Sequence, residues 1–184
     1  MKALKLQTQN KKRFKPSSQQ DKALADRIAD NVLNRDVTAT AVNQKYVAAI
    51  TYIPTTAGWF YLTVVIDVFF RAVIGWSMQS TMTQQLVIDA LFMALQKRNS
   101  PQEILFHADR GSQYCAHDFQ NILNLYHCTI SMSRKGNCWD NSVAESFFHT
   151  LKVELVHHER YTSLEEAKSS IFNSLSRAVS QSWT

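Results

Sequence analysis

The chain has 184 residues, 45% of them hydrophobic, and a formal net charge of +5. This length suits one domain with a full core and is short for two. No apolar run is long enough to span a bilayer, and the basic start lacks the apolar block of a secretory signal. We therefore expect a cytoplasmic protein with no membrane association, and the positive charge favours a polyanionic partner.

Cysteine usage indicates no disulfide framework. The three cysteines, Cys115, Cys128 and Cys138, are an odd number and form no CxxC pair. Reduced, partly buried thiols are the favoured interpretation. A zinc site built with histidines is the weaker alternative, because no Cys or His pair has ligand spacing.

Residues 1–43 are interpreted as a basic arm, a short helix from Asp21 to Leu33 and a linker. Residues 1–15 hold six Lys or Arg residues, and the first acidic residue is Asp21. Such an arm could lie along phosphates and release counterions, or it could be a solvated terminus; the sequence leaves both open.

From Tyr46 the sequence becomes rich in β-forming residues. Three runs, residues 46–53, 58–70 and 72–78, are separated by short breaks, and Gly58 suits the first turn. Spacing this tight predicts an antiparallel meander.

The rest of the chain alternates between helices and strands. Helical periodicity begins at residue 83, where Thr83 is a suitable cap, and a short apolar run, "EILFHAD", predicts a buried parallel strand. The predicted elements are helix 83–98, strand 103–109, helix 112–126, strand 128–133, a glycine-containing loop 135–141 and helix 142–156. This order predicts an α/β fold of ribonuclease H-like architecture, with a mixed five-stranded sheet flanked by helices.

Two acidic residues are placed where chemistry could occur. Asp109 ends a predicted parallel strand, and the carboxyl ends of such strands open onto ligand-binding crevices. Glu145 lies one turn into the last helix, next to the apolar positions that predict its buried stripe, Ala144, Phe148, Leu151 and Leu155. A residue that starts a helix would also explain Asp109, and a solvated surface residue would explain Glu145.

Longer blocks of sequence give these two residues a context. Between Asp109 and Glu145 lie 35 residues, and the blocks "HADRGSQY", "SMSRKGNCWDNSVAESFFHTLKVEL" and "GWFYLTVVIDVFFRAVIGW" occur around them. Together they resemble the DDE transposases of bacterial insertion sequences. The chain most resembles the second-frame catalytic subunit of two-frame elements, which has a retroviral-integrase-like core. The resemblance covers roughly residues 31–172.

The resemblance implies DNA strand cleavage and joining in a bacterial cytoplasm. In that family three carboxylates hold two Mg²⁺ (or Mn²⁺) ions that clamp a phosphoryl transfer, and Asp109 and Glu145 match the second and third. The implied partners are DNA, at element ends and target, and further transposase chains, in a homo-oligomer or with full-length transposase.

The resemblance also implies DNA-contacting residues. Lys152 shares a helical face with Glu145 and His149, because seven residues return to within about 20° of the start. The candidates for DNA contact are Lys152, Arg134, Lys135 and Asn141. Packing is the favoured role of Trp139, and helix capping would explain Asp140 or Asn141 without catalysis.

The first carboxylate of the family pattern is missing here. The pattern places it in the first strand, three residues after an aromatic residue; the aromatic is Tyr46, and the aligned position is Ala49. Asp67 matches a different family position and does not fill the gap. With two carboxylates for two dications, we expect poorly bound metal and an impaired enzyme.

The expected organisation is a remnant of an upstream DNA-binding region at 1–43, an integrase-type core at 44–172 and an aberrant, poorly ordered tail at 173–184, as in a truncated copy. A non-catalytic DNA-binding or dimerising fragment that inhibits active transposase is the alternative. A ribonuclease H-like nuclease of another lineage is a third, against which the "KGNCWDN" block argues.

Overall fold

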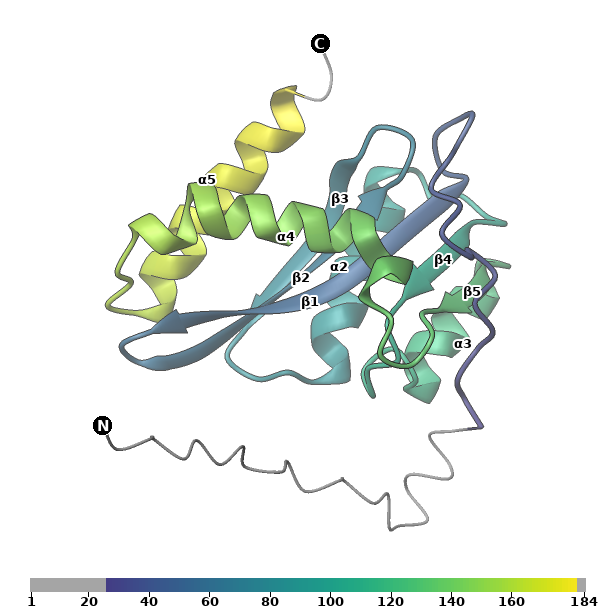
Figure 1. Cartoon of the computed structure of the whole chain (residues 1–184), viewed down its shortest axis with the longest axis horizontal. Coiled ribbons are helices and arrows are strands. Elements are labelled where there is room, and N and C mark those ends of the chain that lie inside the picture. The colour runs from purple at the N-terminus through teal and green to yellow at the C-terminus, as the bar shows by residue number, and fades with distance from the viewer. Residues whose placement is uncertain (1–25, 182–184) are drawn as a thin grey trace, which may run out of the picture.

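The computed structural model describes residues 26–181 and forms one sheet with helices around it (Figure 1). The strands are β1 Lys45–Thr55, β2 Gly58–Asp67, β3 Ala72–Gln79, β4 Leu105–Ala108 and β5 Thr129–Met132. The helices are α2 Gln84–Lys97, α3 His117–Leu125, α4 Ser142–Glu154 and α5 Leu164–Gln181, with short 3-10 helices η1 Cys138–Asn141 and η2 Val156–His158.

The five strands are arranged in the order β3-β2-β1-β4-β5. Strands β1, β2 and β3 pair antiparallel, whereas β4 pairs parallel with both β1 and β5. The predicted meander, the parallel fourth strand and the mixed five-stranded sheet are therefore confirmed.

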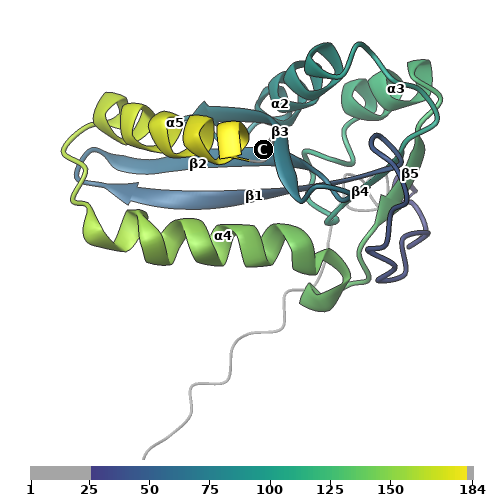
Figure 2. The same cartoon turned by 90° about the horizontal axis from the view of Figure 1, so that it is seen from above.

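Strand β1 separates two hydrophobic clusters, because successive side chains of a strand point to opposite faces. Tyr46 and Ala48 pack in the cluster that includes α2 and α3. Val47 and Ala49 pack in the other cluster, to which α4 and α5 contribute. Helix α4 lies beside β1 (Figure 2), and this places its inner face over the odd-numbered residues of that strand.

A close contact between β3 and α2 requires Gly75. A Cβ atom at this position would overlap the carbonyl oxygen of Ala90 and lie 2.8 Å from the Cβ of Ala94. The two elements approach so closely because Gly75 presents only a hydrogen there.

Several details of the sequence-based prediction are wrong. Residues 26–33 form a turn and an irregular segment instead of a helix, while the rest of the predicted helix and the basic arm lie outside the described residues. The segment from residue 173, predicted to be an aberrant tail, continues α5 to Gln181, and Leu175 in it is buried; its predicted poor order stays a prediction. Thr83 does occupy the N-cap of α2, but its side chain makes no capping hydrogen bond.

Two other expectations concern the cysteines and the membrane. Cys115 and Cys128 are free and buried, as predicted, and the side chain of Cys138 is outside the described part. Among helices within residues 26–181, none combines the length and apolarity needed to cross a membrane.

Candidate active site

The backbone brings positions 49, 109 and 145 to one region of the sheet. The parallel pairing of β1 with β4 ends at Val47 and His107, and Ala49 and Asp109 each lie two residues further along. Since side chains two residues apart share a face, both point to the face that carries α4. Glu145 lies in the first turn of α4 and follows Ala144, which shares a buried cluster with Ala49.

A hollow of about 400 Å³ lies where these elements meet. It is bounded by the end of β4, the loop after β5 and the start of α4. Its lining residues are Asp109, Arg110, Ser133, Arg134, Lys135, Gly136, Asn137, Asn141 and Glu145. The hollow thus joins the two predicted carboxylates with three of the predicted DNA-contacting residues.

The Asp109 carboxylate is held in place by the backbone that follows it. Its Oδ1 accepts a hydrogen bond of 2.8 Å from the Gly111 N–H. A Cβ at Gly111 would lie 2.8 Å from the same oxygen, so glycine allows this approach. The protein around Asp109 disfavours the charged form, and this raises its pKa even though the residue is exposed; the Gly111 N–H opposes the shift.

Ala49 contributes no polar atom to the site. Its side chain is 3% exposed, packs in the apolar cluster beneath α4 and is not among the residues that line the hollow. Among the side chains that the structure describes, no three from His, Cys, Asp or Glu are grouped so that they could hold a metal ion.

Asp140 is a structural anchor and not a helix cap. Its buried carboxylate accepts two hydrogen bonds from the Arg134 guanidinium, at 2.9 and 2.7 Å, and one from the Arg134 N–H. Arg35 and Asn31 donate to it at 3.0 and 2.8 Å. These donors hold the pKa of Asp140 well below its usual range, with Arg134 the largest cause. The Arg134 guanidinium, predicted to contact DNA, is thus already bound to a carboxylate on one side.

Asn141 occupies the N-cap position of α4 but makes no capping bond. Its Nδ2 instead donates a 2.9 Å hydrogen bond to the carbonyl oxygen of Ala48, next to Ala49. Asn141 Oδ1 is buried without a hydrogen-bond partner, and so is Asn137 Oδ1 on the same hollow. Both are acceptors beside the hollow, where water or a bound group could donate to them, since buried acceptors are rarely left unpaired.

His107 is fully buried directly behind the hollow. Its Nδ1 is 2.8 Å from Ser131 Oγ, and its Nε2 is 3.0 Å from Ser133 Oγ. Burial lowers the pKa of His107 to about 4, against a smaller opposing effect of Asp140. The ring is therefore neutral at physiological pH.

Four residues of the hollow were not among the sequence-based site candidates: Arg110, Ser133, Gly136 and Asn137. Arg110 donates from Nε to the Ser133 carbonyl oxygen at 2.7 Å. Their closeness in sequence to Asp109 or Arg134 was the only hint that they belong to the site. Which of them face the hollow depends on the loop conformation, which the sequence does not show.

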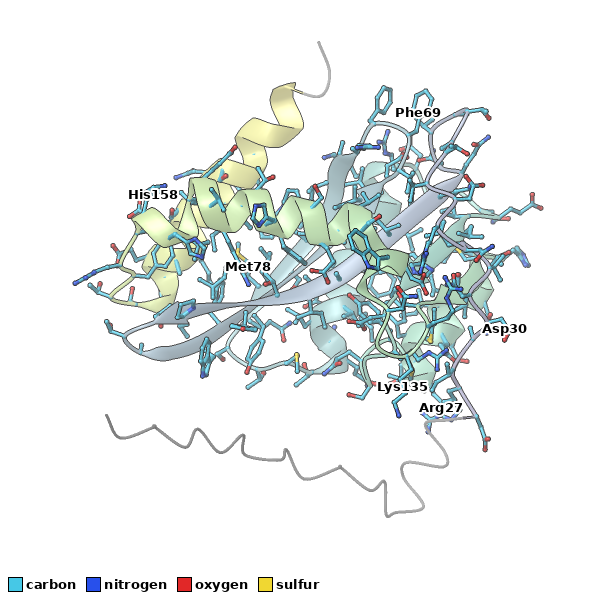
Figure 3. The ribbon with its side chains drawn as sticks, in the orientation of Figure 1. Arg27, Asp30, Phe69, Met78, Lys135 and His158 are labelled. Atoms are coloured by element: carbon cyan, nitrogen blue, oxygen red, sulfur yellow. The ribbon has the colours of Figure 1, made fainter. Side chains whose placement is uncertain are left out.

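Lys152, Trp139 and Asp67 are not among the residues that line the hollow. Lys152 places its Nζ 4.7 Å from the centre of the Tyr52 ring, and Lys135 projects from the loop after β5 (Figure 3). Trp139 is 70% exposed, so the predicted packing role is wrong. Asp67 is buried at the end of β2 and forms an ion pair of 3.3 Å with Arg98, away from the hollow.

A larger hollow of about 680 Å³ lies elsewhere, between β3, α2 and α5. Its lining is mostly apolar and includes Trp76, Met78 and Phe172. The one carboxylate there, Asp89, accepts hydrogen bonds from Gln79 and Gln85. The smaller hollow is therefore the better candidate for chemistry, because it gathers carboxylates and cationic side chains.

Comparison with solved structures identifies the class of fold. The catalytic domain of Mos1 mariner transposase is similar with a TM-score of 0.61 and 16% identity, over 73% of this chain and 70% of that one. The HTLV-2 integrase catalytic core domain in complex with magnesium gives 0.57 and 19%, over 77% and 87%. The fold is that of the ribonuclease H-like catalytic cores of integrases and transposases.

Sequence comparison identifies the family. Residues 39–138 match the family described as "Integrase core domain", residues 126–175 match a second family of the same description, and the chain belongs to this family. "Transposase InsF for insertion sequence IS3A" of Escherichia coli (strain K12) is 46% identical over 168 residues, or 91% of this chain. "Insertion element IS600 uncharacterized 31 kDa protein" of Shigella sonnei is 41% identical over 170 residues, or 92% of the chain. The chain spans 58% and 62% of the length of these two relatives.

Proposed function

We propose that this chain is an insertion-sequence transposase core that binds DNA, and that its strand-transfer chemistry is impaired because Ala49 replaces the first carboxylate. The observation that carries the proposal is the convergence of positions 49, 109 and 145 on one face of the sheet. Asp109 and Glu145 are the proposed catalytic and metal-binding residues, and Ala49 has no side-chain oxygen to offer.

The donors in the hollow suit one hard cation and not two. Mg²⁺ prefers oxygen ligands in near-octahedral geometry and keeps several waters when few carboxylates are available. Asp109 and Glu145 would hold such an ion, and the unpaired oxygens of Asn137 and Asn141 would accept hydrogen bonds from its waters. A bound Mg²⁺ or Mn²⁺ would supply charge stabilisation for phosphoryl transfer. A second ion would lack the ligand that it shares with the first.

In the proposed mechanism, the residues around the hollow hold the carboxylate of Asp109 and the loop after β5 in position. The Gly111 N–H fixes the Asp109 carboxylate, and the carboxylate of Asp140 fixes the loop that carries Arg134 and Lys135. Arg110 and Lys135 add positive charge at the rim, which favours the phosphate backbone of DNA. We propose Lys152, Arg134, Lys135 and Asn141 as DNA-binding residues, with Asn141 acting from the wall of the hollow.

Partners follow from the relatives. One structural neighbour is a simian T-cell lymphotropic virus intasome, and the HTLV-2 integrase core is described in dimeric and trimeric forms. We propose that this chain likewise associates with DNA and with copies of itself or a full-length transposase. The lack of a carboxylate at position 49 also supports the non-catalytic alternative, in which the chain binds DNA or transposase and inhibits active enzyme.

The test compares the chain with Ala49→Asp on duplex DNA that carries the ends of its own element. With Mg²⁺ or Mn²⁺, we expect DNA binding by both proteins and measurable strand cleavage or joining only with Ala49→Asp. Ala49→Asn is the matched control, since it has the same size without the charge. Equal strand transfer by the unaltered chain and Ala49→Asp would contradict the proposed impairment.

A further inference from the structure

A chain of buried hydrogen bonds leads through His107 to the hollow. The Leu33 N–H donates to Ser131 Oγ at 2.9 Å, and that oxygen is 2.8 Å from His107 Nδ1. His107 Nε2 is 3.0 Å from Ser133 Oγ. His107 and Ser131 are paired residues of β4 and β5, so the sheet fixes this arrangement.

Counting protons assigns the direction of each bond. Ser131 is 1% exposed, so its hydroxyl proton needs a protein acceptor. Its oxygen already accepts from Leu33, and His107 Nδ1 is the one acceptor within hydrogen-bond distance in the described part of the chain. We therefore assign the ring proton of the neutral imidazole to Nε2, which lies 3.0 Å from Ser133 Oγ; the backbone of Asp140 also hydrogen-bonds to this ring.

With the ring proton on Nε2, the hydroxyl group of Ser133 has a proton that it does not donate to His107. Its N–H donates to the Ala108 carbonyl oxygen at 2.9 Å, and its carbonyl oxygen accepts from Arg110 Nε at 2.7 Å. Its Oγ accepts from His107. Among the groups that the structure describes, this hydroxyl proton has no acceptor within hydrogen-bond distance other than His107, and Ser133 lines the hollow.

We propose that the Ser133 hydroxyl is a positioning donor to a phosphate oxygen of a nucleic-acid backbone in the hollow, and that His107 holds it in this role. This inference rests on the proposed function, because DNA supplies the phosphate. Arg110, Arg134 and Lys135 line the same hollow and attract an anion, whereas the carboxylates of Asp109 and Glu145 oppose it. The competing acceptor is Asn137 Oδ1, which is also unpaired but does not reach hydrogen-bond distance from Ser133.

The first experiment measures the tautomer of His107 by ¹⁵N NMR at neutral pH, with His107→Gln used to assign the ring signals among the six histidines. We expect an unprotonated Nδ1 and a protonated Nε2. A ring protonated at Nδ1 would overturn the proposal, because Ser133 would then donate to His107 and have no proton for a ligand.

The second experiment titrates inorganic phosphate at constant pH and follows the His107 Nε2 resonance. A phosphate that accepts from Ser133 changes the hydrogen bond on the other side of Oγ, so a saturable shift is expected in the unaltered chain. Ser133→Ala should lose this shift, whereas Asn137→Ala should keep it. No saturable shift, or loss of it in Asn137→Ala alone, would overturn the proposal.

The third experiment measures affinity for a duplex DNA of arbitrary sequence at several salt concentrations, because phosphate contacts are independent of sequence. Ser133→Ala should weaken binding by about tenfold or more, as expected for loss of a hydrogen bond to a charged group. The salt slope should stay unchanged, since a neutral donor releases no counterion, whereas Lys135→Ala should lower the slope by about one. Unchanged affinity in Ser133→Ala would overturn the proposal.

Two controls separate the possible failures. If Ser133→Ala melts early, Ser133→Cys preserves the volume with a weak donor and should show the same loss. If the unaltered chain fails to bind duplex DNA while inorganic phosphate still shifts His107, the proposed function fails and the assignment of Ser133 as a phosphate donor stands.

Discussion

The buried His107 should make the stability of this fold depend on pH between 7 and 5. Burial lowers its pKa from 6.5 to about 4. Between these two values the unfolded chain binds a proton at this histidine and the folded chain does not. The contribution of His107 to the free energy of unfolding is therefore fully present above pH 6.5. It is lost as the pH falls toward 4. The full effect is about 3 kcal/mol, of which about 2 kcal/mol is lost between pH 7 and pH 5.

Urea unfolding at pH 7, 6 and 5 in the absence of divalent metal measures this loss. The His107→Asn variant should be less stable at pH 7, because its hydrogen bonds change, but its stability should fall by less between pH 7 and pH 5. The lowered pKa of Asp140 acts below about pH 4 and so outside this range.

The raised pKa of Asp109 changes the stability with pH in the opposite direction to that of His107. Its raised pKa makes the folded chain bind the proton more readily, so protonation of Asp109 stabilises the fold as the pH falls. The measurement is therefore repeated in an Asp109→Asn background. If His107→Asn keeps the full pH dependence in that background, the buried, neutral histidine is the wrong explanation.

Three further predictions concern single residues of the fold and the site. Gly111→Ala should weaken Mn²⁺ binding in a calorimetric titration by displacing the Asp109 carboxylate, and unchanged affinity would contradict this account. Gly75→Ala should lower the melting temperature strongly, because its Cβ overlaps the Ala90 carbonyl oxygen of α2; a melting temperature like that of the unaltered chain would refute the close packing. Lys152→Ala should weaken DNA binding and lower its salt slope by about one, as for one lost phosphate contact.

The control for Lys152→Ala is Lys168→Ala, which removes the same charge from α5 at the edge of the larger hollow. If both variants weaken DNA binding equally, overall charge accounts for the effect and a specific contact of Lys152 is excluded.

The order of elements and their hydrophobic patterns were sufficient to predict the sheet. The tight spacing of the β runs predicted the meander, and the short apolar run before Asp109 predicted a parallel strand, because both signals are local. The buried stripe of α4 was correct for Ala144, Phe148 and Leu151, while Leu155 caps the helix and is partly buried.

The details of the site depended on contacts between distant segments. Asp140 looked like a helix cap but binds Arg35, which is 105 residues away in sequence, and Asn141 binds the backbone of β1. The inward orientation of Ser133 follows from the contact of its hydroxyl with the ring of His107 on β4. Such long-range partners leave no periodic signal in the sequence, and for the same reason the exposure of Trp139 was missed.

The most direct test of the central claim is a titration of Mn²⁺ into the unaltered chain, Ala49→Asp and Ala49→Asn, with melting curves to confirm that each is folded. We predict weak binding to the unaltered chain and to Ala49→Asn, and roughly tenfold or tighter binding to Ala49→Asp, because a third carboxylate completes the ligand set. Adding Asp109→Asn to Ala49→Asp should remove the gain. Equal Mn²⁺ affinity of the unaltered chain and Ala49→Asp would contradict the claim that the missing carboxylate at position 49 disables the metal site.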